Sequence, residues 1–193
     1  MGYSQFQEDL EIVQHVPATG NLLDLGAWHP TEFSNSRLLI ERGWTATLVE
    51  PSPEPFWTLF KEYGKNPNVR LICAAIGMDR AFAKMHVTAD AVSTLDLATF
   101  EKWKEAGGYY GEMWVPVFTL AEFFNQFGGD WHFVNIDVEG YSCDVFRALL
   151  DSGNRPACIC VEHDGRDVEI TQWARGAGYR QVLMNGTNVV FAL

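Results

Sequence analysis

The chain has 193 residues, 47% of them hydrophobic and 13% aromatic, which is enough to bury the core of one α/β domain. Its formal net charge is −11 and it contains no basic run, which disfavours a nucleic acid or an anionic membrane surface as a partner. With no secretory signal, no membrane-length apolar run and four cysteines without C-x-x-C spacing, we expect a cytoplasmic protein with buried, reduced thiols.

Short apolar runs alternate with longer segments of helical period, a pattern typical of βαβ units. In chain order the first half predicts a helix over residues 4–15 capped by Ser4, a strand at 21–25, a helix capped by Ser34 and ended by Gly43, a strand at 45–49, a helix at 53–63 and a strand at 69–75. An irregular stretch follows at about 76–131. It contains an edge strand at 82–87, a helix near 95–105, a short strand at 115–117 and a helix at 120–127.

Regular alternation resumes after this stretch. The remaining predicted elements are a strand at 132–137, a helix carrying Val145, Phe146, Leu149 and Leu150 on one face, a strand at 157–162, a helix at 168–176, and closing strands at 180–184 and 188–193. Asn185-Gly186 is a turn dipeptide that predicts a hairpin between the last two strands. We therefore expect one α/β domain over residues 1–193: a mostly parallel seven-stranded sheet with helices on both faces and a C-terminal antiparallel hairpin.

Acidic residues stand at the ends of four predicted strands. The segments are Asp24-Leu25-Gly26, Glu50-Pro51, Asp137-Val138-Glu139-Gly140 and Glu162-His163. In an open parallel sheet, ligands bind beyond the carboxyl ends of the strands, where the strand order reverses. The alternative is that each acid only caps the next helix. That alternative accounts for a single strand-end acid more easily than for all four together.

The turn after the first strand carries one glycine, Gly26, so the G-x-G-x-x-G fingerprint of dinucleotide binding is absent. Glu50 ends the second strand, where an acid can accept both ribose hydroxyls. A ribose-binding acid without a phosphate loop predicts an adenosine cofactor without phosphates, of which S-adenosylmethionine is the common one. The residues expected to bind it are Gln5, Asp24, Gly26, Ala27, Asn35, Glu50, Pro51, Ala75, Ser93 and Asp137.

Several of these segments together resemble one known family. They are Tyr3-Ser4-Gln5-Phe6-Gln7-Glu8-Asp9, Asp24-Leu25-Gly26-Ala27 with the following His29-Pro30 and Ser34-Asn35-Ser36, Val49-Glu50-Pro51, and Ile136-Asp137-Val138-Glu139-Gly140. In order and spacing they resemble the FkbM family of S-adenosylmethionine-dependent methyltransferases, over nearly the whole chain. The resemblance implies a Rossmann-like class I methyltransferase fold and O-methylation of a hydroxyl on a saccharide or small natural product.

Two residues depart from the family pattern. Gln7 stands where the family usually has glycine, and Trp28 replaces a usual asparagine or histidine. Trp28 either alters the wall of the cofactor pocket or packs as an ordinary core residue.

Methylation of an alcohol requires a positioned donor and acceptor and a general base for the hydroxyl proton. Asp137 ends the fourth strand, where it can stabilise the sulfonium, orient the acceptor or take its proton. Glu139 either joins the site or favours the N-terminus of the next helix. Glu162 and His163 end the fifth strand, and His163 is the best-placed histidine for a base of near-neutral pKa, unless it is a loop side chain facing water.

Two other functions and a metal site are alternatives to this interpretation. A nicotinamide-dependent oxidoreductase needs the phosphate-binding glycines that are missing here, and a non-catalytic binding module would keep the fold without the chemistry. The oxygens of Asp137, Glu139, Glu162 and Asp164 are of the type that binds a divalent cation. Because the sequence does not fix their geometry, we assign no metal.

Overall fold

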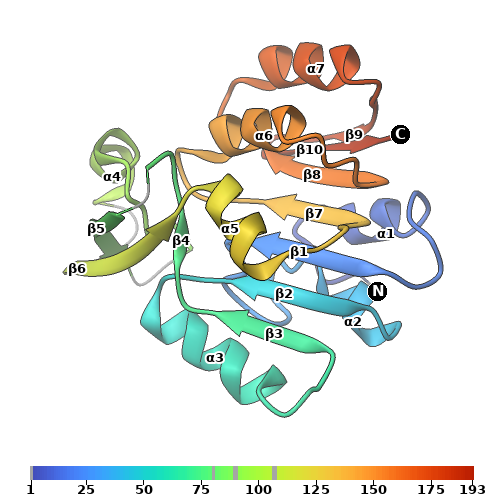
Figure 1. The fold of residues 1–193 in the computed structure, drawn as a ribbon. Helices are drawn as coiled ribbons and strands as arrows, with labels where there is room; N and C mark the ends of the chain where they lie inside the picture. Colours follow the sequence, from blue (N-terminus) through green and yellow to red (C-terminus); the bar gives the residue numbers. More distant parts are fainter. Residues whose placement is uncertain (1, 80, 89–90, 106–107) are drawn as a thin grey trace.

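The chain folds around a central sheet (Figure 1), seen here in a computed structural model that describes all residues except 1, 80, 89–90 and 106–107. The seven strands lie in the order β3-β2-β1-β7-β8-β10-β9. They are β1 (Asn21–Leu25), β2 (Thr45–Val49), β3 (Val69–Ile72), β7 (Phe133–Ile136), β8 (Cys158–Glu162), β9 (Arg180–Met184) and β10 (Asn188–Ala192). β10 runs antiparallel to both β8 and β9, and the other pairings are parallel. The predicted sheet and C-terminal hairpin are confirmed.

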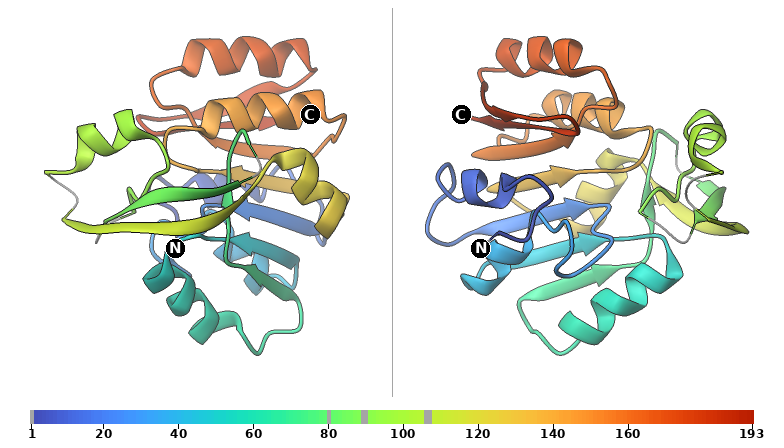
Figure 2. Two further views of the ribbon diagram at one scale, coloured as in Figure 1. Left: turned by 60° about the vertical axis from the view of Figure 1, so that its left-hand side comes forward. Right: turned by 180° about the vertical axis from the view of Figure 1, so that it is seen from behind.

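Helices cover both faces of this sheet (Figures 1 and 2). One core joins β1 to the three C-terminal helices α5 (Leu120–Phe127), α6 (Ser142–Asp151) and α7 (Asp167–Gly176), and the other joins it to α1 (Glu8–Ile12), α2 (Arg37–Glu41) and α3 (Pro53–Tyr63). In β1, Leu23 and Leu25 belong to the core with α5, α6 and α7, and Leu22 belongs to the core with α1, α2 and α3; all three have no exposed surface. Burial on both faces explains why the strand sequences are almost continuously apolar.

A second, three-stranded sheet stands beside the carboxyl edge of the first and projects from the molecule (Figure 2). Its strands are β4 (Ala75–Ile76), β5 (Ala81–Thr88) and β6 (Tyr109–Phe118), in the order β4-β6-β5, with α4 (Leu97–Trp103) between β5 and β6 along the chain. A small core of Ala75, Met85, Val115 and Val117 lines one side of it. This sheet occupies most of the segment that we expected to be irregular.

The structure corrects several element boundaries. The strand expected at 69–75 breaks at 73–74, so that Ala75 and Ile76 join the second sheet, and the short strand expected at 115–117 is the end of the ten-residue β6. The helix expected from Ser34 begins at Arg37, although the Ser34 hydroxyl still accepts a hydrogen bond from the Arg37 N–H (3.1 Å). Cys73 is exposed, whereas the other three cysteines are buried as expected.

The leading helix is also shorter than expected. α1 covers only Glu8–Ile12, because Gln7 adopts a left-handed backbone conformation with φ 68° that separates residues 3–6 from the helix. Ser4 does not begin a helix. Its hydroxyl instead accepts a hydrogen bond from the Asp9 N–H and donates one to the Asp9 carboxylate. Among the described residues, no helix has the length and apolarity needed to cross a membrane.

Candidate active site

A cavity of about 330 Å³ lies at the carboxyl ends of β1, β2, β7 and β8. The chain leaves β1 towards β2 and β3 on one side and leaves β7 towards β8 on the other, so the cavity sits where the strand order reverses. All ten residues expected to bind a cofactor line it: Gln5, Asp24, Gly26, Ala27, Asn35, Glu50, Pro51, Ala75, Ser93 and Asp137. Strand-end position accounts for Asp24, Glu50 and Asp137, whereas Gln5, Asn35 and Ser93 reach the cavity from other segments.

Gly26 lets the two central strands approach closely at the cavity floor. Its φ is +83°, and a Cβ atom there would lie 1.7 Å from the Asp137 carbonyl oxygen. Glycine is required on both grounds, because other residues rarely adopt this conformation and no side chain fits the gap. The close approach sets the relative positions of the β1 and β7 ends.

Glu50 is a buried carboxylate in the cavity wall. It accepts hydrogen bonds from the backbone N–H groups of Trp28 (3.0 Å) and Ser52 (2.6 Å). Burial raises the pKa of Glu50 to about 7, the charge of Asp24 adds to the rise, and the backbone hydrogen bonds oppose it. Two loops therefore orient the Glu50 carboxylate, and its oxygens can accept further hydrogen bonds from a ligand.

A chain of buried side-chain amides extends from Asp24. Asn135 donates to the Asp24 carboxylate (2.9 Å), and Asn35 donates to the Asn135 side-chain oxygen (3.0 Å). Burial raises the pKa of Asp24. Within the described part of the chain the Asn35 side-chain oxygen is buried and has no hydrogen-bond partner, although Asn35 lines the cavity. A buried, unpartnered acceptor beside a carboxylate suits a ligand that donates hydrogen bonds and carries positive charge.

Asp137 and Glu162 form a carboxyl–carboxylate pair. Their side chains hydrogen bond to each other, and Ser142 donates to Glu162 (3.3 Å). Burial raises the pKa of both groups, and the Asp137 charge raises that of Glu162 further, to well above its usual range. Because two close carboxylates cannot both ionise cheaply, the pair holds one proton near neutral pH.

Glu139 lies beside this pair, and one oxygen from each of Asp137, Glu139 and Glu162 can be found within 4.8 Å of the others. The fourth residue weighed as a metal ligand, Asp164, is not in this group. Acidic groups at this spacing can also act by sharing protons, so the cluster does not by itself establish a metal site.

The second sheet contributes the remaining wall. Thr94 donates a hydrogen bond to the Glu139 carbonyl oxygen (2.7 Å), which ties the loop before α4 to the loop after β7. Ser93 accepts a hydrogen bond from the Thr88 N–H (3.1 Å). Met85 and Trp103 complete this side of the lining. Parts of the segment 76–131 therefore border the cavity.

His163 is not among the described residues that line the cavity. Its Nδ1 accepts a hydrogen bond from the Gly165 N–H (3.0 Å), and its Nε2 lies 3.3 Å from the Asn185 carbonyl oxygen. Both ring nitrogens are thus engaged with the backbone of neighbouring loops, which suits a structural histidine.

Several residues that approach the site were not expected from the sequence. Glu8 has no exposed surface and accepts hydrogen bonds from Asn185 and Asn188, and Asn188 lines the cavity. Trp28 and Phe33 stack on each other in the lining (centroids 5.7 Å apart), both with left-handed backbone conformations. The departure at Trp28 from the usual asparagine was the one sequence signal of this feature, since asparagine tolerates that conformation well.

Comparisons with known proteins bear on the family and the fold. A family model described as "Methyltransferase FkbM domain" matches residues 20–181. No curated protein sequence matches the chain. A crystal structure of methyltransferase FkbM from Methylobacillus flagellatus KT shares 12% identity with a TM-score of 0.55; the alignment covers 91% of this chain but only 44% of that one.

Two further solved structures share the fold. A precorrin-6y C5,15-methyltransferase from Geobacter metallireducens GS-15 is 12% identical with a TM-score of 0.53, over 98% of this chain and 88% of that one. A protein of the NADB-Rossmann superfamily from Streptococcus agalactiae is 12% identical with a TM-score of 0.51, over 100% of this chain and 70% of that one. At these identities the likeness concerns the fold.

Proposed function

The chain belongs to the FkbM methyltransferase family, and we propose that it binds S-adenosylmethionine in the cavity and methylates a hydroxyl group of a saccharide or small natural product. The observation that carries this proposal is the position of Glu50, a buried carboxylate at the end of β2 in a cavity whose floor has the single turn glycine Gly26. That combination fits a ribose and does not provide the glycine loop that cradles a pyrophosphate.

The residues present fit this cofactor. Glu50 would accept the ribose hydroxyls, and Asp24 and the unpartnered Asn35 oxygen would accept hydrogen bonds from the ammonium of its methionine part. Once bound, the cofactor supplies an electrophilic methyl group on a positively charged sulfur. The carboxylates of the cavity would favour that charge, and the close approach at Gly26 fixes the relative positions of the β1 and β7 ends that border the cavity.

The Asp137–Glu162 pair is suited to receive the acceptor's proton. With the cofactor bound as methyl donor, the Asp137 carboxylate would take the proton that the acceptor hydroxyl must lose on methylation. Glu162, which keeps its own proton, donates a hydrogen bond that orients Asp137. Glu139 would orient the acceptor from the same rim.

The acceptor we propose is neutral or cationic. Six of the described lining residues carry carboxyl groups, and the described lining contains no lysine, arginine or histidine. A phosphate-bearing acceptor such as a nucleic acid would meet this acidic rim unfavourably, in keeping with the net charge of −11.

Two measurements test the proposal. Calorimetry with S-adenosylhomocysteine and with NAD should give binding to the first alone, and binding to NAD alone would support the oxidoreductase instead. Transfer of a labelled methyl group should then be screened over neutral saccharides and hydroxylated natural products. With an acceptor in hand, Asp137→Asn should lower kcat by at least about 100-fold while changing the S-adenosylhomocysteine Kd little. Wild-type turnover in that variant would eliminate Asp137 as the base.

A further inference from the structure

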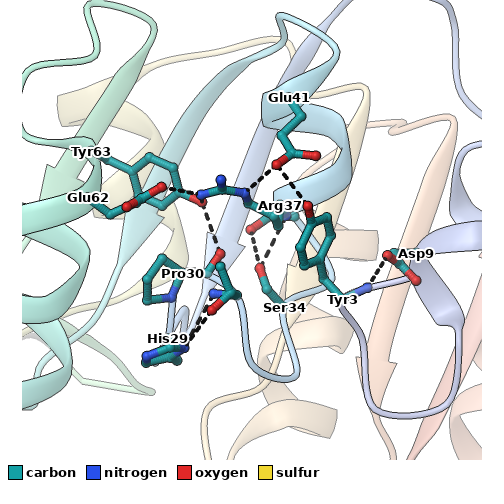
Figure 3. A network of polar contacts seen from close by, with 11 residues as sticks. Tyr3, Asp9, His29, Pro30, Ser34, Arg37, Glu41, Glu62 and Tyr63 are labelled. Carbon is teal, nitrogen blue, oxygen red and sulfur yellow. Dashed lines mark hydrogen bonds and ion pairs between the residues drawn. The ribbon is translucent and has the colours of Figure 1, made fainter. Parts of the chain in front are cut away.

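Outside the cavity, Arg37 connects its own helix α2 with the N-terminal segment and with helix α3 (Figure 3). Its guanidinium forms ion pairs with Glu41 (2.9 Å) on its own helix and with Glu62 (2.5 Å) at the end of α3, and it donates to the Tyr63 hydroxyl (3.2 Å). The same group lies against the rings of Tyr3 and Tyr63, 5.7 and 5.6 Å from their centroids. Arg37 thus lies near two tyrosines that come from distant parts of the chain. Arg37, Glu41, Glu62, Tyr3 and Tyr63 are called the Arg37 cluster below.

One arm of the Arg37 cluster holds the loop after β1. The Tyr63 hydroxyl, which accepts from Arg37, donates to the Pro30 carbonyl oxygen (3.1 Å) in a buried contact. The loop that contains Pro30 supplies seven lining residues of the cavity: Gly26, Ala27, Trp28, Glu32, Phe33, Ser34 and Asn35. Two of its aromatic residues, Trp28 and Phe33, have backbone conformations that non-glycine residues rarely adopt. Such a loop keeps its shape only if its surroundings hold it.

The other arm holds the N-terminal strap (residues 3–7). The Tyr3 hydroxyl donates to Glu41 (2.9 Å) at one end of the strap. At the other end Glu8 accepts from the Phe6 N–H (2.8 Å) and, with its second oxygen, from the side chains of Asn185 and Asn188 near β10. Gln5, between these two anchors, lines the cavity. The strap therefore bridges from the α2 side of the site to the β10 side, across the cavity.

We propose that Arg37 is a positioning residue for cofactor binding: through Tyr63 it fixes the loop after β1, and through Tyr3 and Glu41 it holds the N-terminal strap over the same cavity. The inference rests on the proposed function, because it assumes that the ligand of this cavity is S-adenosylmethionine. Arg37 is not itself among the described lining residues, although its backbone N–H donates to the lining residue Ser34 (3.1 Å). Its guanidinium therefore acts by holding two walls at a fixed separation.

Exposure and geometry both favour positioning over simple stabilisation. The side chains of Glu41 and Glu62 are 39% and 44% exposed, and ion pairs at such exposure contribute little to global stability. The guanidinium is needed because it donates to the oxygens of Glu41, Glu62 and Tyr63 from a fixed planar fork and also lies near two tyrosine rings. A lysine ammonium would keep the positive charge, but it could not maintain the contacts with Tyr3 and Tyr63 together.

The chain offers a matched control for the loop arm. Tyr179 also donates a buried hydrogen bond from its hydroxyl to a proline carbonyl oxygen, that of Pro156 (2.9 Å), and it is absent from the described cavity lining. Tyr63→Phe and Tyr179→Phe remove the same type of bond and should lower the free energy of unfolding by similar amounts. Calorimetric titration with S-adenosylhomocysteine should give a Kd raised about five-fold in Tyr63→Phe and unchanged in Tyr179→Phe.

The strap arm and Arg37 itself are tested in the same assay. Tyr3→Phe should raise the Kd about three-fold, whereas Tyr110→Phe, at an exposed tyrosine on β6, should not. Arg37→Lys should raise it about ten-fold or more, since it weakens both arms. All variants are compared at a temperature where denaturation curves show them folded.

The outcomes separate the two hypotheses. If the wild-type protein binds S-adenosylhomocysteine and Tyr63→Phe binds it as tightly as Tyr179→Phe, the positioning role of Arg37 is wrong and the proposed function stands. Equal affinity of Arg37→Lys and wild type leads to the same conclusion. If the wild-type protein does not bind S-adenosylhomocysteine, the proposed function fails and the role of Arg37 with it.

Discussion

Glu50 should make the stability of the protein depend on pH in a direction opposite to that of most acidic residues. Its pKa is raised to about 7 in the folded state by burial, against 4.5 as the ordinary value. Between these two values the folded state binds more protons than the unfolded state, so stability falls as pH rises. The contribution is fully present below pH 4.5 and is lost by the time pH has risen through about 7.

The magnitude follows from the shift. At about 1.36 kcal/mol per pKa unit, Glu50 should cost about 2.5 kcal/mol of the free energy of unfolding between pH 5 and pH 8. No reduction for solvent screening is needed because Glu50 is only 4% exposed. Asp24, Asp137 and Glu162 also have raised pKa values and add to the slope in the same direction.

A variant isolates the contribution of Glu50 from those of its neighbours. Glu50→Gln removes the titration and should be destabilised at acid pH, since its amide cannot accept from both the Trp28 and Ser52 N–H groups. The loss of stability from pH 5 to pH 8, measured by urea denaturation of both proteins, should be smaller in the variant by about 2.5 kcal/mol. Parallel pH profiles for wild type and Glu50→Gln would refute the raised pKa and with it the picture of Glu50 as a buried, tunable ribose acceptor.

Two further substitutions test the backbone of the site. Gly26→Ala should lower the free energy of unfolding by more than about 2 kcal/mol and abolish S-adenosylhomocysteine binding, because its Cβ would collide with the Asp137 carbonyl oxygen. Urea denaturation measures the first effect and calorimetry the second. Near-wild-type values for both would disprove the close approach. Gln7→Gly should raise the free energy of unfolding by about 1 kcal/mol by relieving the left-handed conformation before α1, which an unchanged or lower denaturation midpoint would contradict.

Local signals predicted the main sheet and the ends of some helices well. α3 spans the expected residues because Pro53 stands in its first turn, and α5 does because Thr119 and Glu122 form a capping box. The strand-end acids converged because parallel strands end on one edge, a rule that needs no knowledge of pairing partners. These features depend on residues close in sequence.

The second sheet and the Arg37 cluster depend on distant contacts and could not be predicted in the same way. β5 pairs with β6 across the segment that contains α4, and the half-exposed ribbon that results has no continuous apolar run to reveal its length. Tyr3, Arg37 and Tyr63 meet only once α2 and α3 are packed on the sheet. His163 was favoured by its place after β8, but the backbone groups that engage its ring are set by the fold of neighbouring loops.

The strained residues link these two groups of features. Four of the five non-glycine residues with positive φ in the described chain, Gln7, Trp28, Phe33 and Glu139, lie in the cavity lining or next to the strap that crosses it. Each such conformation costs on the order of 1 kcal/mol or more, and a protein tolerates it only where other contacts determine the backbone. The contacts that hold Gln7, Trp28 and Phe33 in place include Glu8 with Asn188, Glu50 with Trp28, and the Arg37 cluster. Some of those contacts come from residues that would also bind the cofactor, so cofactor binding and loop geometry should be coupled. Loosening either arm of the Arg37 cluster should therefore weaken the affinity for the cofactor more than it lowers the free energy of unfolding.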